Sequence, residues 1–351
     1  MENKNFDFSI PSSWLEGTGQ FSDIILSSRI RINRNIKNRK FVSWSSNQEL
    51  QELTDNLFEV VPIINYFKNS YSFKFGSERW HNSDLFPERF ICNYKFINSE
   101  FPRGIIIGEN EDLSVLINNH DHLNIQVYQS GLNLDDLFLL ISKIQDEFEN
   151  NLNFSYSEQF GYLSSLPTLS GTGMKGSIIV HLPAMLRMGD ISILMKTLSH
   201  LRCNFSSLFS SGPQIIQGDL FMISNQVTLG ITEEEIIDSL SKIAMEMLNY
   251  ENNAREKLFQ LKRYEIEDEI FRSFGVLQNA RSITFDETIS NLSMVRLGRS
   301  LNIIKNIDWK TLNSLLVLLQ DRHIEMNFKG IFNKDEKNYK RAELLREALK
   351  S

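Results

Sequence analysis

The 351-residue chain has few of the features that mark secreted, membrane-spanning or nucleic-acid-binding proteins. It has only two cysteines, Cys92 and Cys203, which excludes a disulfide framework. No apolar run reaches membrane-spanning length, and the first residues lack the apolar core of a signal peptide. The net charge of -7 argues against a general nucleic-acid or acidic-membrane partner, because phosphate binding normally needs a basic face. These absences predict a cytoplasmic protein.

What remains is a globular composition, with 41% hydrophobic and 23% charged residues. A chain of this length is expected to hold two domains. We place a lead-in at residues 1–20, a larger domain at 21–230 and a helical domain at 231–351. Thr232 and Glu235 form a capping box. It predicts a long amphipathic helix, and further helices are expected over about 309–319 and 335–349.

A strand is expected over residues 23–32, where Ile24, Leu26, Ile30 and Ile32 alternate with polar residues. Ser27, Arg29 and Arg31 then share the other face. Side chains two residues apart on a strand lie about 7 Å apart, a spacing at which two arginines can grip successive phosphates. A solvated strand face explains the pattern equally well, so both interpretations stay open.

The stretch 114–127 also alternates like a strand, but the polar residues 118–122 interrupt it. If the period continues, Asn119 and Asp121 share the face of Ile117 and Leu123, while His120 points the other way. A polar run inside an apolar strand costs desolvation unless it is paired, which indicates a functional site. A covered sheet edge or a bulge is the alternative. We expect no metal, because the sequence offers no second cluster at ligand spacing.

Helices are expected over about 48–67 and, after a cap at Asn133, up to about residue 150. A glycine-rich loop over 161–177 ends near Lys175 and leads into a strand at 178–180. Such a loop can bring backbone N–H groups and a charge to a phosphate, although it does not match GxxxxGK[ST] and an ordinary turn explains it too. A helix at about 190–201, a loop at 206–218 and a strand at 220–223 follow.

Taken together, these stretches resemble the ATP:guanido phosphotransferases. The resemblance rests on the strand segment 26–35 with Arg29 and Arg31, the polar run 118–126, the glycine-rich segment 161–184 and the segment 224–230. The helical part, from Gly275 to Arg346, is similar to that of the bacterial protein arginine kinases, a branch of the same family. The resemblance covers the chain from about residue 20 to its last residue.

The resemblance implies an α+β fold: an antiparallel sheet flanked by helices, followed by an all-helical domain that dimerises or regulates. It implies transfer of the γ-phosphoryl group of ATP, with Mg²⁺, to a guanidino nitrogen. Arginines neutralise the phosphates and a glutamate takes the guanidinium proton, as phosphoryl transfer to a cationic acceptor requires. The ATP-binding positions that it implies are Ser28, Arg29, Arg31, Asn124, Lys175, Gly176, Ser177 and Ser206.

The chain departs from the family pattern at the positions that carry this chemistry. Asn119 and His120 replace two glutamates of the base region, and of its acidic residues only the following Asp121 is kept. Asn124 and Ser206 replace arginines, and Lys175 keeps a positive charge without the bidentate fork of an arginine. The family's phosphoarginine pocket is half retained, at Lys337, Asn338, Arg341 and Ala342.

These departures favour a degenerate kinase that acts as a regulator or scaffold in protein quality control. It is expected to form a homodimer and to pair with an active paralogue, a stress-response adaptor or an unfoldase. The rival hypothesis is an active kinase with Arg29, Arg31 and Lys175 on the phosphates and Asp121 or His120 as the base. A nucleotide-binding switch without transfer, or an acceptor less cationic than arginine, also stays open.

Overall fold

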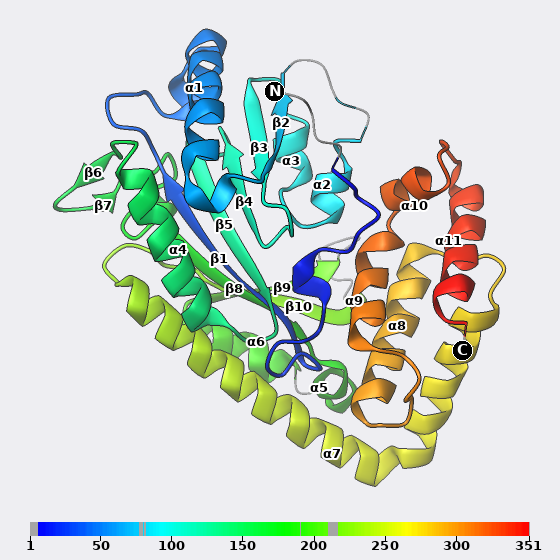
Figure 1. Cartoon of the computed structure of the whole chain (residues 1–351). Helices are drawn as coiled ribbons and strands as arrows, with labels where there is room; N and C mark the ends of the chain where they lie inside the picture. The colour runs from blue at the N-terminus through cyan, green and yellow to red at the C-terminus, as the bar shows by residue number, and fades with distance from the viewer. Residues whose placement is uncertain (1–5, 77–79, 81, 190, 210–216, 351) are drawn as a thin grey trace.

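The computed structural model describes residues 6–76, 80, 82–189, 191–209 and 217–350. Within these residues an antiparallel sheet has the strand order β2-β3-β4-β5-β1-β8-β10-β9, and a small second sheet pairs β6 with β7 (Figure 1). The strands are β1 Ile25–Arg34, β2 Tyr71–Phe75, β3 Arg103–Ile107, β4 Leu113–Ile117, β5 Leu123–Ser130, β6 Tyr156–Ser157, β7 Gly161–Tyr162, β8 Met174–His181, β9 Cys203–Phe209 and β10 Gln217–Asn225.

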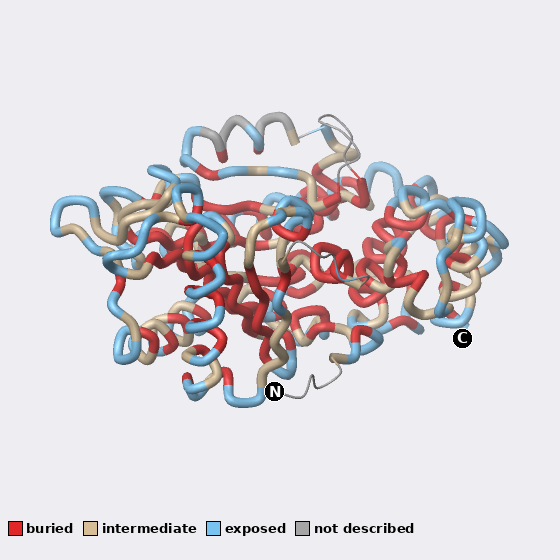
Figure 2. The backbone as a smooth tube through the Cα atoms, turned by 90° about the horizontal axis from the view of Figure 1, so that it is seen from above, coloured by how far each residue is buried: buried red, intermediate tan, exposed pale blue. Residues whose placement is uncertain are grey.

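One face of the large sheet is apolar and is covered by long helices. The alternating Ile30, Ile125 and Ile178 pack there against α1 (Asn47–Val60), α4 (Leu134–Glu149) and α7 (Glu233–Asn279) in one buried core. Gly176 lets α7 approach, because a Cβ at this position would lie 2.5 Å from Leu240 Cδ1. Figure 2 shows the buried backbone concentrated in the sheet and in the inner sides of the helices.

The opposite face is covered over only part of its width. At the β2–β4 end, α2 (Leu85–Glu88), α3 (Tyr94–Ile97) and the N-terminal Phe8 form a second apolar cluster with Ile105. Along β5, β1 and β8 the same face carries Tyr128, Arg29 and Ser177, which are direct cross-strand partners. The helix arrangement therefore leaves a polar part of the sheet next to the second cluster, and a cavity forms there.

The C-terminal part is helical, as the resemblance implies, and so the predicted fold class is confirmed. Helix α7 begins at the expected capping box of Thr232 and Glu235 and bends at Lys262, whose φ and ψ of -136° and 32° are not helical. Figure 1 shows α7 running past the sheet and then on to the other C-terminal helices. These are α8 Phe285–Ser300, α9 Trp309–Leu318, α10 Asp321–Asn327 and α11 Lys334–Ala348. The domain boundaries at residues 20 and 230 stay predictions.

A buried charge cluster joins α10 to α2, to the turn between β3 and β4 and to the N-terminal segment. Glu88 of α2 accepts hydrogen bonds from the backbone N–H of Arg322 (2.9 Å) and of His323 (3.1 Å), so it caps α10. The neighbouring Arg89 is ion-paired with Glu111 and donates to the carbonyl oxygen of Phe8 at 2.9 Å. These parts of the chain are thereby tied together away from water.

The prediction of one continuous strand over 114–127 is wrong. The chain reverses after β4 and returns as β5, so that Val115 lies opposite Ile125 in a hairpin. The polar residues form its turn: Asn118 has a φ of +55°, and its N–H bonds to the carbonyl oxygen of His122 at 3.0 Å. Because the period of two does not continue through a reversal, the predicted faces of Asn119 and His120 do not apply.

Two other boundaries were also predicted wrongly. The expected helix over 48–67 ends at Val60 as an α-helix, and short 3-10 turns follow because Pro62 cannot continue the hydrogen-bond ladder. Part of the expected loop over 206–218 is strand, since β9 includes Ser206 and ends at Phe209. Residues 210–216 of that loop lie outside the described residues. The serine-rich composition favours a loop, but pairing with β10 holds this segment as a strand.

Candidate phosphate site and neighbouring cavities

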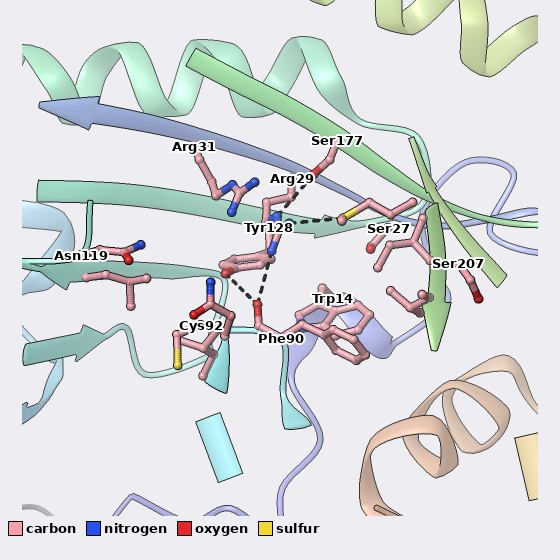
Figure 3. A pocket seen from close by; sticks show the side chains of 16 residues that line it. Trp14, Ser27, Arg29, Arg31, Phe90, Cys92, Asn119, Tyr128, Ser177 and Ser207 are labelled. Atoms are coloured by element: carbon pink, nitrogen blue, oxygen red, sulfur yellow. Dashed lines mark hydrogen bonds between the residues drawn. The ribbon is translucent and has the colours of Figure 1, made fainter. Parts of the chain in front are cut away.

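A cavity of about 280 Å³ lies on the polar face of the sheet, at the edge of the second apolar cluster (Figure 3). Its floor comes from β1, β5 and β8, and its wall comes from the segment around Phe90 and from Trp14. Arg29, Arg31 and Ser177 line it, so three of the eight predicted ATP-binding residues meet at one cavity. The hydroxyl groups and aromatic rings of the lining carry no charge, so these two guanidinium groups are the main charges of the cavity.

Arg29 is held across the cavity by defined contacts. Its Nε donates to Ser177 Oγ at 3.3 Å and its Nη1 donates to the carbonyl oxygen of Phe90 at 3.3 Å. The guanidinium carbon lies 5.7 Å from the ring centroid of Tyr128. Phe90 has a φ of +60°, a strained value for a non-glycine residue, and this conformation directs its carbonyl oxygen toward the arginine. Arg29 is therefore preorganised before any ligand arrives.

Arg31 and Lys175 bring two more positive charges close to Arg29. They are cross-strand partners between β1 and β8. Burial and the charge of Arg29 lower the pKa of Arg31 to about 9, and burial, Arg31 and Arg29 lower the pKa of Lys175 to about 8. Arg31 Nε is buried and makes no hydrogen bond within the described part of the chain. Like charges crowded in this way are stabilised by a bound anion.

The shifted pKa of Lys175 predicts how anion affinity changes with pH. Its folded-state pKa is lowered, so the ammonium loses its charge between about pH 7 and pH 9, whereas the phosphates of ADP stay ionised. We expect the affinity for ADP to fall by up to about tenfold over that range. Calorimetric titration at both pH values measures the change. Lys175→Met should bind more weakly and lose most of this dependence, and equal affinities of the unchanged protein at both pH values would contradict the assignment.

A second cavity, of about 420 Å³, adjoins the first and shares Asn93 and Asn119 with it. It is lined on one side by the start of α1 and on another by Lys95 of α3. His120 and Leu166 complete the lining at the hairpin turn and at the glycine-rich segment. Among the residues that the structure describes, neither cavity is lined by an aspartate or a glutamate.

Asp121, the one acidic residue kept from the family pattern, lines neither cavity. It is fully buried and accepts hydrogen bonds from Asn35 Nδ2 (2.7 Å), Ser164 Oγ (2.6 Å) and the N–H of Ser165 (2.8 Å). His122 is also buried, accepts from the N–H of Ile36 and donates to a carbonyl oxygen, and burial lowers its pKa. These two residues anchor the hairpin turn to neighbouring loops.

Other predicted ATP-binding residues lie elsewhere. Ser28 is on the apolar face, where its Oγ accepts from the N–H of Asn133 at the start of α4. Gly176 also lies on that face, against α7. Asn124 is buried and donates to Asn33 Oδ1 at 2.7 Å, and Ser206 is exposed on β9. None of these four lines either cavity.

Sequence reasoning missed several residues that do line the first cavity. Tyr128 could have been found, because the period of two along β5 places it, like Asn124, on the sheet face that carries Arg29, its cross-strand partner. Phe90, Asn93 and Trp14 gave no periodic signal, because they come from segments without regular strands or long helices. Only packing brings these segments onto the sheet.

A third cavity, of about 410 Å³, lies between the C-terminal helices and is lined by Lys337, Asn338 and Arg341. Three of the four residues predicted for the phosphoarginine pocket thus meet, whereas Ala342 is buried in the core. The cations already have partners, since Arg341 is paired with Asp321 at 2.6 Å and Lys337 with Glu325 at 2.8 Å. An incoming anion must therefore compete with these carboxylates.

Within the described residues, no helix is both long and apolar enough to cross a membrane, and no group of three or more His, Cys, Asp or Glu could hold a metal ion. A divalent cation at the first cavity would have to be coordinated chiefly by the phosphates of a nucleotide, because the lining supplies no carboxylate.

Comparisons with known proteins agree with this geometry. The family model "ATP:guanido phosphotransferase, C-terminal catalytic domain" matches residues 67–254, and "Protein-arginine kinase McsB C-terminal domain" matches residues 263–351. The chain is 33% identical to a protein-arginine kinase of Clostridium acetobutylicum over 96% of this chain and 99% of the relative. It is 34% identical to a protein-arginine kinase of Bacillus subtilis over 99% of this chain and 96% of the relative.

Solved structures show the same fold. Lombricine kinase aligns with a TM-score of 0.55 at 19% identity, over 71% of this chain and 70% of that chain. The duplicated taurocyamine kinase from Schistosoma mansoni aligns with a TM-score of 0.55 at 18% identity, over 70% of this chain and 34% of that one. The fold is therefore that of the guanidino kinases. Within this class, the chain belongs to the protein-arginine kinase branch of the ATP:guanido phosphotransferase family.

Proposed function

We propose that this chain is a nucleotide-binding regulator or scaffold of the protein-arginine kinase family that has lost efficient phosphoryl transfer. One observation carries the proposal: Arg29 and Arg31 line the phosphate site, but no carboxylate lines the two adjoining cavities within the described residues. A guanidinium group becomes a nucleophile only when a base orients and deprotonates it. Phosphate binding is thus supported by this chain's residues, and transfer to arginine is not.

ATP fits the first cavity by charge. Arg29 and Arg31 would contact the phosphates, and Lys175 would add a third positive charge beside them. The buried Arg31 Nε, which has no partner within the described residues, is a donor ready for a phosphate oxygen. Mg²⁺ would enter with the nucleotide and help to neutralise its phosphates.

A weakly active kinase is the second candidate, and the position of His120 favours it. This side chain lines the second cavity, and burial together with the charge of Lys95 lowers its pKa. A neutral imidazole can accept a proton. It carries no negative charge to hold a guanidinium, however, and Asp121 is buried and does not line the cavity.

Calorimetric titration with MgATP and MgADP, followed by assays for acid-labile phosphate on casein and on free arginine, tests both candidates. Binding without transfer is the expected result. Binding with transfer would overturn the regulator in favour of the kinase. The absence of nucleotide binding would leave a scaffold only and would contradict the nucleotide-binding part of the proposal.

Restoring the two missing glutamates is expected not to rescue the enzyme. In the double variant Asn119→Glu and His120→Glu, transfer to arginine should stay below about 1% of that of the Bacillus subtilis relative assayed in parallel. The reason is that Asn124 and Ser206 stand where the resemblance implies arginines, and one cation on a transferring phosphoryl group contributes about 10³–10⁵ in rate. Substantial phosphorylation of arginine by the double variant would refute this explanation.

The proposal extends to partners. We propose a homodimer, with exposed apolar residues of the second half of α7, such as Leu261, Tyr264 and Phe271, as candidates for its interface. An active paralogue, a stress-response adaptor or an unfoldase remain the proposed targets of regulation. Such a role in protein quality control needs no catalysis by this chain, only a shape that responds to a bound nucleotide.

A further inference from the structure

The second cavity has the wrong charge for a guanidinium ligand. Its only ionisable lining residues within the described part are Lys95 and His120. Burial lowers the pKa of His120, and the charge of Lys95 lowers it further. Asp121 acts in the opposite direction, and Arg31 of the first cavity adds a smaller lowering effect. A positively charged side chain entering this space would be repelled, and a negatively charged one attracted.

The neutral part of the lining can donate hydrogen bonds. Asn93 uses its Oδ1 to cap α3, at 2.8 Å from the N–H of Phe96, which leaves its amide NH₂ group as a donor. Asn119, also shared by both cavities, has the same donor group, and the hydroxyl of Ser43 and the amide of Asn47 lie around the same space. Amide and hydroxyl donors beside an ammonium suit a carboxylate or a phosphate.

The dimensions suit a side chain presented by a peptide. The cavity of about 420 Å³ is in the range of small-ligand sites. Phe96, Phe101 and Leu166 supply apolar walls against which the neighbouring atoms of a peptide can pack. Lys95 is exposed, so its ammonium can meet a ligand arriving from solvent.

We propose that this second cavity binds an anionic side chain of a partner peptide, either a carboxylate or a phosphate monoester, instead of an arginine. The inference rests on the proposed function, because it assigns a ligand to a regulator whose acceptor site no longer binds arginine. Lys95 and the amides of Asn93 and Asn119 bind the anion, and no covalent step follows.

Fluorescence polarisation with short fluorescein-labelled peptides tests the proposal on the full chain. The peptides are identical except for a central phosphoserine, glutamate, serine or arginine. We expect the phosphoserine peptide to bind at least about tenfold more tightly than the arginine peptide, the ratio that about 1.4 kcal/mol of charge preference gives. If the glutamate peptide binds as well as the phosphoserine peptide, the ligand of the cavity is any acidic peptide. If only the phosphoserine peptide binds, the ligand is a phosphorylated peptide.

Two charge reversals locate the site. Lys95→Glu should abolish or invert the preference for the phosphoserine peptide, because the one ammonium among the described lining residues becomes a carboxylate. Lys257→Glu is the matched control: Lys257 is exposed on α7, which packs on the opposite face of the sheet, and its reversal should leave the preference unchanged.

The inference is overturned if the arginine peptide binds as tightly as the phosphoserine peptide, or if Lys95→Glu has no effect. MgADP titration of the same samples separates the two proposals. Nucleotide binding with no anionic preference defeats only the present inference, and anionic preference with no nucleotide binding defeats only the nucleotide-binding proposal.

Discussion

Replacing Arg89 by alanine is expected to lower the free energy of unfolding by about 3–5 kcal/mol, because the variant leaves Glu111 as a buried, unpaired charge. Arg89 is completely buried, and its Nε donates to Glu111 Oε2 at 2.9 Å. It also holds the carbonyl oxygen of Phe8, so that the N-terminal segment should loosen as well. Urea unfolding followed by tryptophan fluorescence measures the loss.

A matched control comes from an exposed pair of the same chemistry. Arg263 and Glu267 form an ion pair of 2.9 Å on α7, with Arg263 largely in solvent. Arg263→Ala should change stability little, because exposed ion pairs contribute little. The double variant Arg89→Ala and Glu111→Ala should lose less than the sum of its two single variants, since no unpaired charge remains. A loss below about 1 kcal/mol for Arg89→Ala would contradict this account of the cluster.

Replacing Arg31 by alanine is expected to weaken MgADP binding by about 10–100-fold, the effect of about 1.5–3 kcal/mol from a hydrogen bond to a charged group. Arg31 is the best candidate because Arg29 is partly engaged by Ser177 and Phe90, whereas Arg31 Nε is buried without a partner in the described residues. The loss of one positive charge should also raise the pKa of Lys175, which Arg31 now lowers. Calorimetry at constant ionic strength provides the affinity.

The more conservative variant Arg31→Lys tests whether a positive charge alone is enough for binding or whether the planar guanidinium group is needed. It keeps a cation but loses the planar fork, so its affinity for MgADP should lie between those of Arg31→Ala and the unchanged protein. Arg263→Ala again serves as the surface control. If Arg31→Ala binds MgADP as tightly as the unchanged protein does, the nucleotide lies elsewhere and the first cavity is not the phosphate site.

The proposed loss of transfer concerns charge and leaves the architecture unaffected. The sheet holds Arg29 against Ser177 and the carbonyl oxygen of Phe90, whereas Asn119 and His120 bring no negative charge to the lining of the second cavity. On our proposal, the chain keeps its fold without the reaction, because folding depends on the apolar face of the sheet and the reaction depends on a few side chains of the opposite face.

Local residue patterns determined a large part of this structure. The alternation around Ile30 and Ile32 predicts β1, and the capping box of Thr232 and Glu235 predicts the start of α7, because both signals act over a few residues. The positions of Arg29 and Arg31 on one strand face follow from the same period of two. The family assignment from short motifs is confirmed, and with it the antiparallel sheet and the helical C-terminal part.

Tertiary structure decided where each polar group points and what it meets. Asp121 and His120 are neighbours in the sequence, but the hairpin turn buries Asp121 and leaves His120 beside a cavity. A strand period cannot predict this difference, because the chain reverses at this turn. The cavity around Arg29 depends on Trp14, Phe90 and Tyr128, which are distant in the chain and meet only by packing. Residue types and short periods are local properties, whereas burial, pairing and pKa arise from contacts across the whole fold.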